Sequence, residues 1–129
     1  MNGLNLTAKI FLLSGSINAM LAVILGAFGA HALKTRLDES LLKIYQTGNE
    51  YHFYHALGLI LIGIIAMNIP VNAWLKYSGW MMFAGIILFS GSLYLLSILN
   101  LRWLGMITPV GGVLFIFAWA SLCIAILKQ

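Results

Sequence analysis

The sequence has 129 residues, of which 62% are hydrophobic and only 8% are charged. Soluble domains carry about 25% charged residues, so the composition excludes an ordinary soluble protein and indicates a membrane protein. The seven Lys and Arg residues give a net charge of +4. They are dispersed rather than gathered in a basic stripe, which argues against a nucleic-acid partner. The single cysteine, Cys123, excludes an intrachain disulfide.

Four apolar segments are long enough to cross a bilayer, which takes roughly 20 residues. They contain no Asp, Glu, Lys or Arg and cover residues 10–31, 52–69, 78–99 and 104–127. The sequence therefore predicts an all-α integral membrane protein, with residues 1–129 forming a single four-helix transmembrane bundle. A cleaved signal peptide is the alternative for the first segment, with Lys9 as its basic flank and "AHA" at 30–32 as its cleavage site. The apolar region exceeds the limit of ~15 residues for such peptides, so we expect a retained span.

The connection at residues 34–50 has the pattern of an amphipathic helix. Its apolar face recurs every fourth residue, at Leu33, Leu37, Leu41 and Tyr45. Thr35 and Asp38 have the spacing of a capping box, and Gly48 offers a stop or bend before the second span. We expect an amphipathic interfacial helix lying along the membrane surface. The alternative is a helical extension of the second span into water.

Basic residues are divided almost evenly between the two sides of the predicted bundle. With four spans, both termini lie on one side and the 34–50 connection lies on the other. The connection side holds Lys34, Arg36, Lys43 and Arg102, and the terminal side holds Lys9, Lys76 and Lys128. Because basic residues favour the cytoplasmic side, this count leans towards termini outside the cytoplasm.

Small residues mark the expected contacts between helices. Helices in lipid associate through close packing of small side chains and through interhelical hydrogen bonds. The first span carries a stripe with steps of 4, 3, 4 and 3 residues, at Gly15, Ala19, Ala22, Gly26 and Gly29. Further packing positions on the third and fourth spans are Gly91, Gly111 and Gly112. The stripes predict a tight bundle, or alternatively a seam between two copies of the chain.

Polar residues gather in the half of the bundle nearest the 34–50 connection, which predicts a polar pocket there. The candidates for its lining are His31, Gln46, Glu50, Tyr51, His55, Ser90, Ser92, Tyr94 and Thr108. At about 100° per residue, Glu50 and His55 are about 140° apart on an unbroken helix and cannot form a direct dyad. The alternative for the histidines is a structural hydrogen bond at a helix end or between helices.

Two further features of this region bear on chemistry. The three histidines His31, His52 and His55, together with Glu50, satisfy the ligand count of a zinc site, although no tight metal-binding motif is present. In "TPVGG" at 108–112, Pro109 suits the first turn of the fourth span, and Thr108 is the candidate N-cap. Its alternative role is ligand binding at the positive end of the helix.

Four motifs in register resemble one family of small membrane proteins. They are "GAFGAH" (26–31), "YQTGNEYHFYH" (45–55), "LFSGSLY" (88–94) and "TPVGG" (108–112), followed by Trp119. Together they resemble the YgdD family of small bacterial inner-membrane proteins, which is the domain of unknown function 423, with eukaryotic relatives called transmembrane protein 256. The resemblance covers nearly the whole chain and implies a four-helix integral membrane protein in the bacterial inner membrane. It implies no mechanism.

Three functional hypotheses remain open from the sequence. The first is a non-enzymatic membrane protein that binds a partner or small ligand at the connection-side pocket, because no carboxylate can be placed to orient a histidine as a catalytic triad requires. The second is a small proton-coupled transporter, since ionisable groups at membrane depth are functional candidates. The third is metal or haem binding. We expect no resident cofactor. The expected partners are the lipid bilayer and either a second copy of the chain or another membrane protein.

Overall fold

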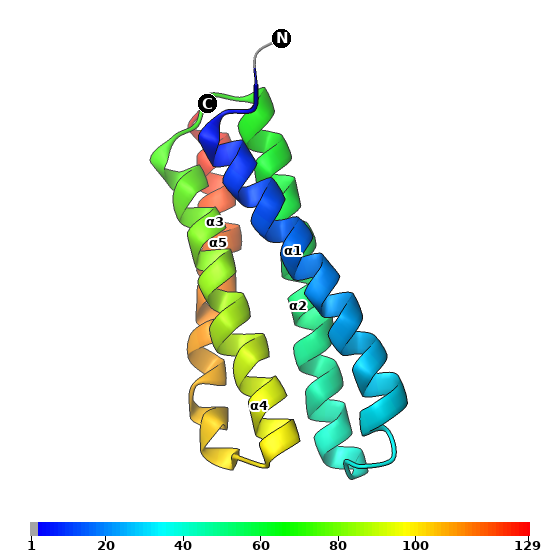
Figure 1. Ribbon diagram of the computed structural model, residues 1–129. Helices are drawn as coiled ribbons and strands as arrows, with labels where there is room; N and C mark the ends of the chain where they lie inside the picture. The colour runs from blue at the N-terminus through cyan, green and yellow to red at the C-terminus, as the bar shows by residue number, and fades with distance from the viewer. Residues whose placement is uncertain (1–2) are drawn as a thin grey trace.

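The computed structural model describes residues 3–129, and their regular structure is entirely helical. Within these residues, five α-helices, two π-helical stretches and one 3₁₀ turn build the bundle (Figure 1). In chain order they are α1 (Leu6–Phe28), η1 (Gly29–Leu33), α2 (Glu39–Asn68), α3 (Ala73–Gly85), η2 (Ile86–Gly91), α4 (Ser92–Leu99), η3 (Arg102–Met106) and α5 (Thr108–Leu127). η1 and η2 are π-helical stretches that continue α1 and α3, and η3 is a 3₁₀ turn.

The helices alternate in direction, so the two chain ends lie at the same end of the bundle (Figure 1). Within residues 3–129, four continuous helices are long and apolar enough to cross a membrane: Leu6–Leu33, Glu39–Asn68, Ala73–Leu99 and Arg102–Leu127. The predicted all-α protein with four transmembrane helices is therefore confirmed. At 1.5 Å per residue these helices are about 40–45 Å long, which exceeds the hydrocarbon thickness of about 30 Å. Each helix therefore tilts or extends past the hydrocarbon.

The small-residue stripe of α1 faces α2 of the same chain. A Cβ atom added at Gly15 would lie 2.8 Å from the backbone oxygen of Ala56. Farther along α1, an added Cβ at Gly26 would meet the Asn49 side chain at 2.9 Å. Ala22 is buried and Ala19 is half-buried in the same seam. Close approach of the two helices thus depends on small residues along the whole length of α1.

The third span packs closely against α5, and Gly111 is one of the glycines that allow it. A Cβ at Gly111 would lie 2.3 Å from the Phe89 backbone nitrogen, so this glycine allows the backbones of α5 and η2 to approach each other closely. Two of the predicted packing positions behave differently. A Cβ at Gly91 would meet nothing within 4 Å, and one at Gly112 would make ordinary contact with the Phe89 ring at 3.7 Å. The prediction of close packing is therefore wrong at Gly91, which faces open space, and at Gly112, where an added Cβ would make only ordinary contact.

The predicted interfacial helix is not a separate element, because α2 runs unbroken from Glu39 to Asn68. The alternative, a helical extension of the second span, describes the structure. Gly48 lies inside this helix, where an added Cβ would touch the Leu93 Cβ at 3.0 Å; the glycine therefore makes room for α4 instead of ending the helix. The apolar face of 34–50 packs inside the bundle: Leu41 joins Leu96 and Leu104 in a small core cluster.

The start of α2 is fixed by Asp38 and not by Thr35. The Asp38 carboxylate accepts a hydrogen bond from the Leu41 backbone N–H at 2.8 Å and one from the Ser40 hydroxyl at 2.7 Å. The bond from the Leu41 N–H, followed by that from Ser40, lowers the pKa of Asp38 from its ordinary value of 3.8. Thr35 lies in the turn before the helix. The capping residue is thus one turn later than predicted.

The start of α5 also differs from its prediction. Pro109 does lie in the first turn, and residues 102–106 form an entering 3₁₀ turn. Thr108, however, caps nothing: its hydroxyl lies 2.6 Å from the Ser92 hydroxyl of α4 and 3.4 Å from the Leu104 carbonyl oxygen. The interhelical bond occupies the side chain that the N-cap prediction assigned to the helix end.

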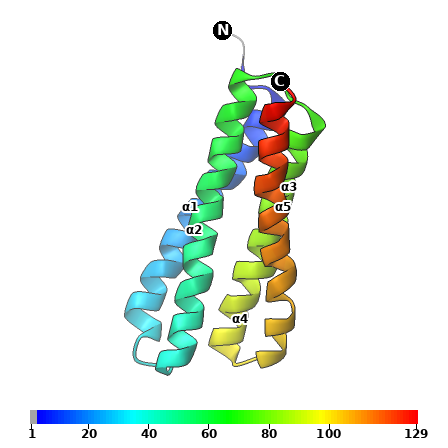
Figure 2. The same ribbon diagram turned by 180° about the vertical axis from the view of Figure 1, so that it is seen from behind.

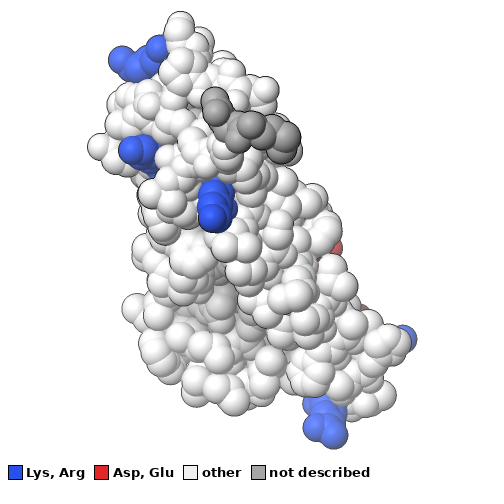
Figure 3. Space-filling model, turned by 45° about the horizontal axis from the view of Figure 1, so that its top comes forward, with Lys and Arg blue, Asp and Glu red and all other residues white. Residues whose placement is uncertain are grey.

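Charge is distributed as a membrane-spanning bundle requires. On the face shown in Figure 3, Lys and Arg side chains lie in the upper half and at the lower end of the view, and most of the remaining surface is uncharged. The belt between the ends therefore suits the bilayer hydrocarbon.

Candidate functional site

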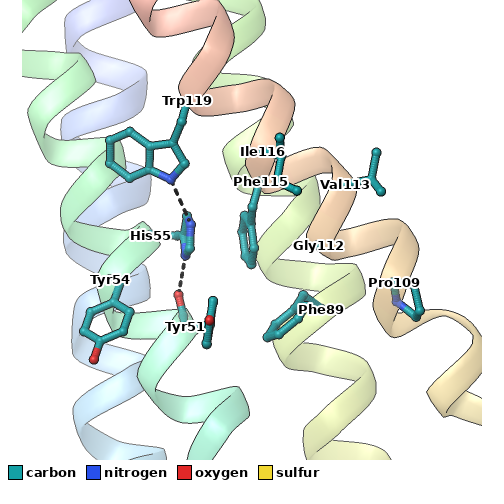
Figure 4. Close-up of a pocket in the computed structure, with 10 residues that line it drawn as sticks. All are labelled: Tyr51, Tyr54, His55, Phe89, Pro109, Gly112, Val113, Phe115, Ile116 and Trp119. Atoms are coloured by element: carbon teal, nitrogen blue, oxygen red, sulfur yellow. Dashed lines mark hydrogen bonds between the residues drawn. The ribbon is translucent and has the colours of Figure 1, made fainter.

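A cavity of about 640 Å³ opens between α2 and α5, which lie side by side in Figure 2. Figure 4 shows its walls, with Phe89 of η2 between the two helices. We call this cavity the α2–α5 groove; its lining residues are Tyr51, Tyr54, His55, Phe89, Pro109, Gly112, Val113, Phe115, Ile116 and Trp119. Nearly all of this lining is apolar or aromatic, in contrast to the polar pocket predicted for the same half of the bundle.

His55 ties the two walls of the groove together. Its ring stacks on Phe115 with the ring centres 3.5 Å apart and the planes 8° apart. Its Nδ1 lies 2.7 Å from the Tyr51 carbonyl oxygen, which accepts only, so Nδ1 carries the hydrogen. Nε2 then accepts a hydrogen bond from the Trp119 indole N–H at 3.1 Å (Figure 4). Both ring nitrogens of this buried, neutral imidazole are therefore engaged.

The tyrosines give the groove an aromatic side on α2. Tyr51 packs on Phe89, with the ring centres 4.7 Å apart, and meets Tyr54 edge to face at 5.9 Å. Tyr51 is 39% exposed and Tyr54 is 55% exposed. The two phenol rings thus stand at the accessible edge of the groove rather than in the packed core.

A second polar arrangement lies inside the bundle, where α1, α2 and α4 meet. Asn49 donates to the Ala22 carbonyl oxygen at 2.8 Å and to the Tyr94 hydroxyl at 3.1 Å. The Tyr94 hydroxyl lies 2.9 Å from His52 Nδ1, and His52 Nε2 lies 3.0 Å from the Asn18 side-chain oxygen. Because that oxygen only accepts, Nε2 carries the hydrogen and Nδ1 accepts from Tyr94. The result is a one-directional chain of hydrogen bonds across three helices, which we call the Asn18–Asn49 network.

The nine predicted pocket residues therefore do not share one cavity. Tyr51 and His55 line the α2–α5 groove, whereas Tyr94 belongs to the Asn18–Asn49 network. Ser92 and Thr108 bond to each other. The remaining four are His31, Gln46 and Glu50, which are exposed, and Ser90, which is fully buried. Within residues 3–129 the Ser90 hydroxyl has no hydrogen-bond partner.

The three histidines are likewise kept apart. His31 is exposed at the end of the first span, in η1. His52 and His55 are buried, and each has both ring nitrogens within hydrogen-bond distance of other groups. Among the described residues, no group of three or more His, Cys, Asp or Glu side chains is placed to hold a metal ion. His52 and His55 follow the structural alternative, that of hydrogen bonds between helices.

Several residues of these sites were not among the sequence candidates. Asn18, in the first span, accepts a hydrogen bond from His52, which is 34 positions away in the sequence. Phe89 and Phe115 lie in apolar runs that carry no signal of a cavity. For Trp119, the sequence offers only its position after the "TPVGG" motif, which does not indicate a role in a binding site. A search for polar residues at membrane depth selects Asn18, whereas the aromatic groove requires knowledge of which helices face each other.

Comparison with known proteins agrees with this architecture. The family model described as "Protein of unknown function (DUF423)" matches residues 25–112. A UPF0382 membrane protein of Staphylococcus epidermidis (strain ATCC 12228 / FDA PCI 1200) is 48% identical over 120 residues, which cover 93% of this chain and 97% of that protein. UPF0382 membrane protein YwdK of Bacillus subtilis (strain 168) is 48% identical over 126 residues, with 93% and 98% covered. No solved structure matches the chain.

These matches confirm the resemblance carried by the four motifs, which span residues 26–112. The relatives are named as membrane proteins, and the bundle has four helices that can cross a bilayer. The chain is an integral, multi-pass membrane protein, and it belongs to the DUF423 family of proteins of unknown function.

Proposed function

We propose that this protein is a non-enzymatic membrane protein that binds a hydrophobic molecule in the α2–α5 groove. The observation that carries the proposal is the groove itself, a cavity of about 640 Å³ with an apolar, largely aromatic lining. Ligand pockets measure about 300–1,000 Å³ and are lined mainly by apolar and aromatic side chains with a few polar groups. Here the polar group of the inner wall is the His55 imidazole, held by Tyr51 and Trp119.

The position of the groove favours a ligand that enters from the bilayer. Its α5 wall runs from Pro109 to Trp119, which covers about 15 Å along the helix axis. Both walls belong to helices that can span the membrane. Pro109 is near the connection-side end of α5, so the groove runs from that side towards the middle of the bilayer. A hydrocarbon chain of the connection-side leaflet has the matching direction and polarity.

The non-enzymatic part of the proposal rests on how the reactive groups are used. Ser92 bonds to Thr108 and not to a histidine, and the ring nitrogens of His55 are both occupied. A proton-coupled carrier receives less support for the same reason, since the buried histidines are fixed by their partners.

The proposal also includes a bacterial inner-membrane location, with both termini outside the cytoplasm. This orientation is based on four basic residues on the connection side against three on the terminal side.

Photo-crosslinking tests the groove directly. The full chain is reconstituted in phosphatidylglycerol bilayers that contain a trace of phosphatidylglycerol with a diazirine halfway along one acyl chain, and the labelled residues are mapped by mass spectrometry. We expect labels to concentrate on 51–55 and 109–119. Labelling spread evenly over the lipid-facing surface, for example equally strong on Leu21 and Ile64, would overturn the proposal.

A matched pair of variants separates groove binding from general lipid contact. Ile116 lines the groove and is 68% exposed, whereas its neighbour Phe117 is 56% exposed and outside the groove. Ile116→Trp should fill the groove and remove the concentrated labelling. Phe117→Trp should leave it unchanged. Circular dichroism of both variants checks that the bundle remains helical.

A further inference from the structure

The outward face of α2 changes from polar to apolar at the edge of the groove. Four exposed residues with steps of 4, 3 and 4 form one stripe on this face, at Glu39, Lys43, Gln46 and Glu50. The same face continues through Tyr54 to apolar residues, which are Leu57, Leu61 and Ile64. Tyr54 lines the groove, so the polar stripe ends where the groove begins.

Glu50 lies at a depth where neighbouring helices are still apolar. Asn49 bonds to Ala22 of α1 and to Tyr94 of α4, which sets these three residues at one level. From this level the first span continues for eleven residues to Leu33 and α4 for five residues to Leu99. At 1.5 Å per residue, Glu50 is therefore about 7–16 Å inside the ends of these helices. Because the helices exceed the hydrocarbon thickness of about 30 Å, this level lies near the hydrocarbon edge, where an exposed carboxylate is stabilised by a partner of opposite charge.

The surroundings of Glu50 specify the charge of such a partner. The basic residue nearest to it on the stripe is Lys43, two helical turns away. The rings of Tyr51 and Tyr54, one and four positions farther along, stand at the groove edge. Glu50 and Tyr54 are four positions apart and share one face of α2, and a carboxylate one turn from an exposed phenol ring attracts a cation through charge and through the face of the ring. The groove beside them accepts hydrocarbon.

We propose that the groove selects a membrane lipid whose head group ends in an ammonium, with the ammonium at Glu50, Tyr51 and Tyr54 and an acyl chain in the α2–α5 groove. This proposal rests on the function proposed above and adds the class of ligand. Its occupant is a lipid of the bilayer, because the groove lies in the membrane-spanning part of the bundle. The head group then lies towards the connection side, where the polar stripe begins.

Two photo-lipids that differ only in their head group test the selection. Trace phosphatidylethanolamine and trace phosphatidylglycerol, carrying the same diazirine acyl chain, are compared in phosphatidylglycerol bilayers with the full chain. We expect the ethanolamine lipid to label 51–55 and 109–119 about three- to tenfold more strongly, as an interaction of about 0.7–1.4 kcal/mol implies. Glu50→Gln should reduce this ratio to about one. Glu39→Gln is the matched control, because it removes the same charge from the same stripe three turns farther from the groove, and it should preserve the ratio.

The outcomes of this experiment separate the two proposals. If both lipids label the groove equally, or if Glu50→Gln keeps the preference, the ammonium selection is wrong while the groove remains a hydrophobic binding site. If neither lipid concentrates its labels in the groove, the proposed function itself fails. Loss of the preference in Glu39→Gln as well as in Glu50→Gln would show a general effect of surface charge and would also overturn the selection at Glu50.

Discussion

Two glycines that look alike in the sequence should respond in opposite ways to the same substitution. Both Gly91 and Gly111 lie inside helical segments, and alanine is favoured over glycine there by about 0.5–1 kcal/mol. At Gly91 the added Cβ meets no atom within 4 Å, so this gain should appear in full. At Gly111 the Cβ would lie 2.3 Å from the backbone nitrogen of Phe89 and 2.7 Å from its Cα. Backbone atoms cannot rotate away, so α5 must move from η2.

The size of the effect follows from the cost of overpacking, which is about 1–3 kcal/mol. After the helical gain is subtracted, the range is about 0–2.5 kcal/mol, and Gly111→Ala should lower the free energy of unfolding by about 1 kcal/mol at its middle. Gly91→Ala should raise it by about 0.5–1 kcal/mol. Equilibrium unfolding in mixed micelles with increasing dodecyl sulfate, followed by circular dichroism, measures both. Equal shifts of the two variants, or stabilisation by Gly111→Ala, would refute the assigned contact between Gly111 and Phe89.

Three further substitutions test individual hydrogen bonds. Asn18→Leu leaves the buried His52 N–H without its acceptor and should lower the free energy of unfolding by about 1–3 kcal/mol. Asn68→Leu, at an exposed position, is the control and should change this free energy by less than about 0.5 kcal/mol. Trp119→Phe removes the N–H that bonds to the His55 imidazole. In the same micelle assay it should lower the free energy of unfolding by about 0.6 kcal/mol, and by about 1.7 kcal/mol at most. The lowered pKa of Asp38 means that its carboxylate stabilises the folded chain above pH 3.8 and that this contribution is lost as the pH falls through the folded pKa. Asp38→Asn keeps a capping side chain and should flatten that part of a stability profile measured from about pH 5 to about pH 2; an unchanged profile would exclude Asp38 as its cause.

The sequence predicts the spans well because length and apolar composition are local properties. Four runs without charge are enough to specify four helices, and short connections make neighbours antiparallel. The stripe from Gly15 to Gly29 likewise needs only the helical repeat to be visible. The helical repeat does not show how each helix is rotated about its axis, and therefore which neighbouring helix each of its faces contacts. His52 and His55 differ by three positions, yet one faces α1 and α4 and the other faces α5.

The errors at Gly48 and Thr108 share a cause. Each residue has a common local role, as a cap or as a helix stop, and each local role was assigned from neighbours in the sequence. Gly48 makes room for Leu93, and the Thr108 hydroxyl meets Ser92. Tertiary contacts thus replaced the local preference. The π-helical turn of η2 adds a further shift in register that a 3.6-residue repeat does not contain.

The groove and the histidine in its wall are connected by one physical requirement. A cavity between two helices in lipid persists only if something fixes their separation, because the helices otherwise gain contact by closing it. The Phe115 ring stacked on His55 fills the back of the gap, and the Trp119 N–H bonds to the same imidazole. Breaking that bond in an apolar environment would leave two polar groups unpaired, so the width of the groove is fixed before any ligand arrives. A preformed groove avoids part of the ordering cost of binding, so under the proposed function His55 would contribute to hydrophobic recognition without any change in its protonation.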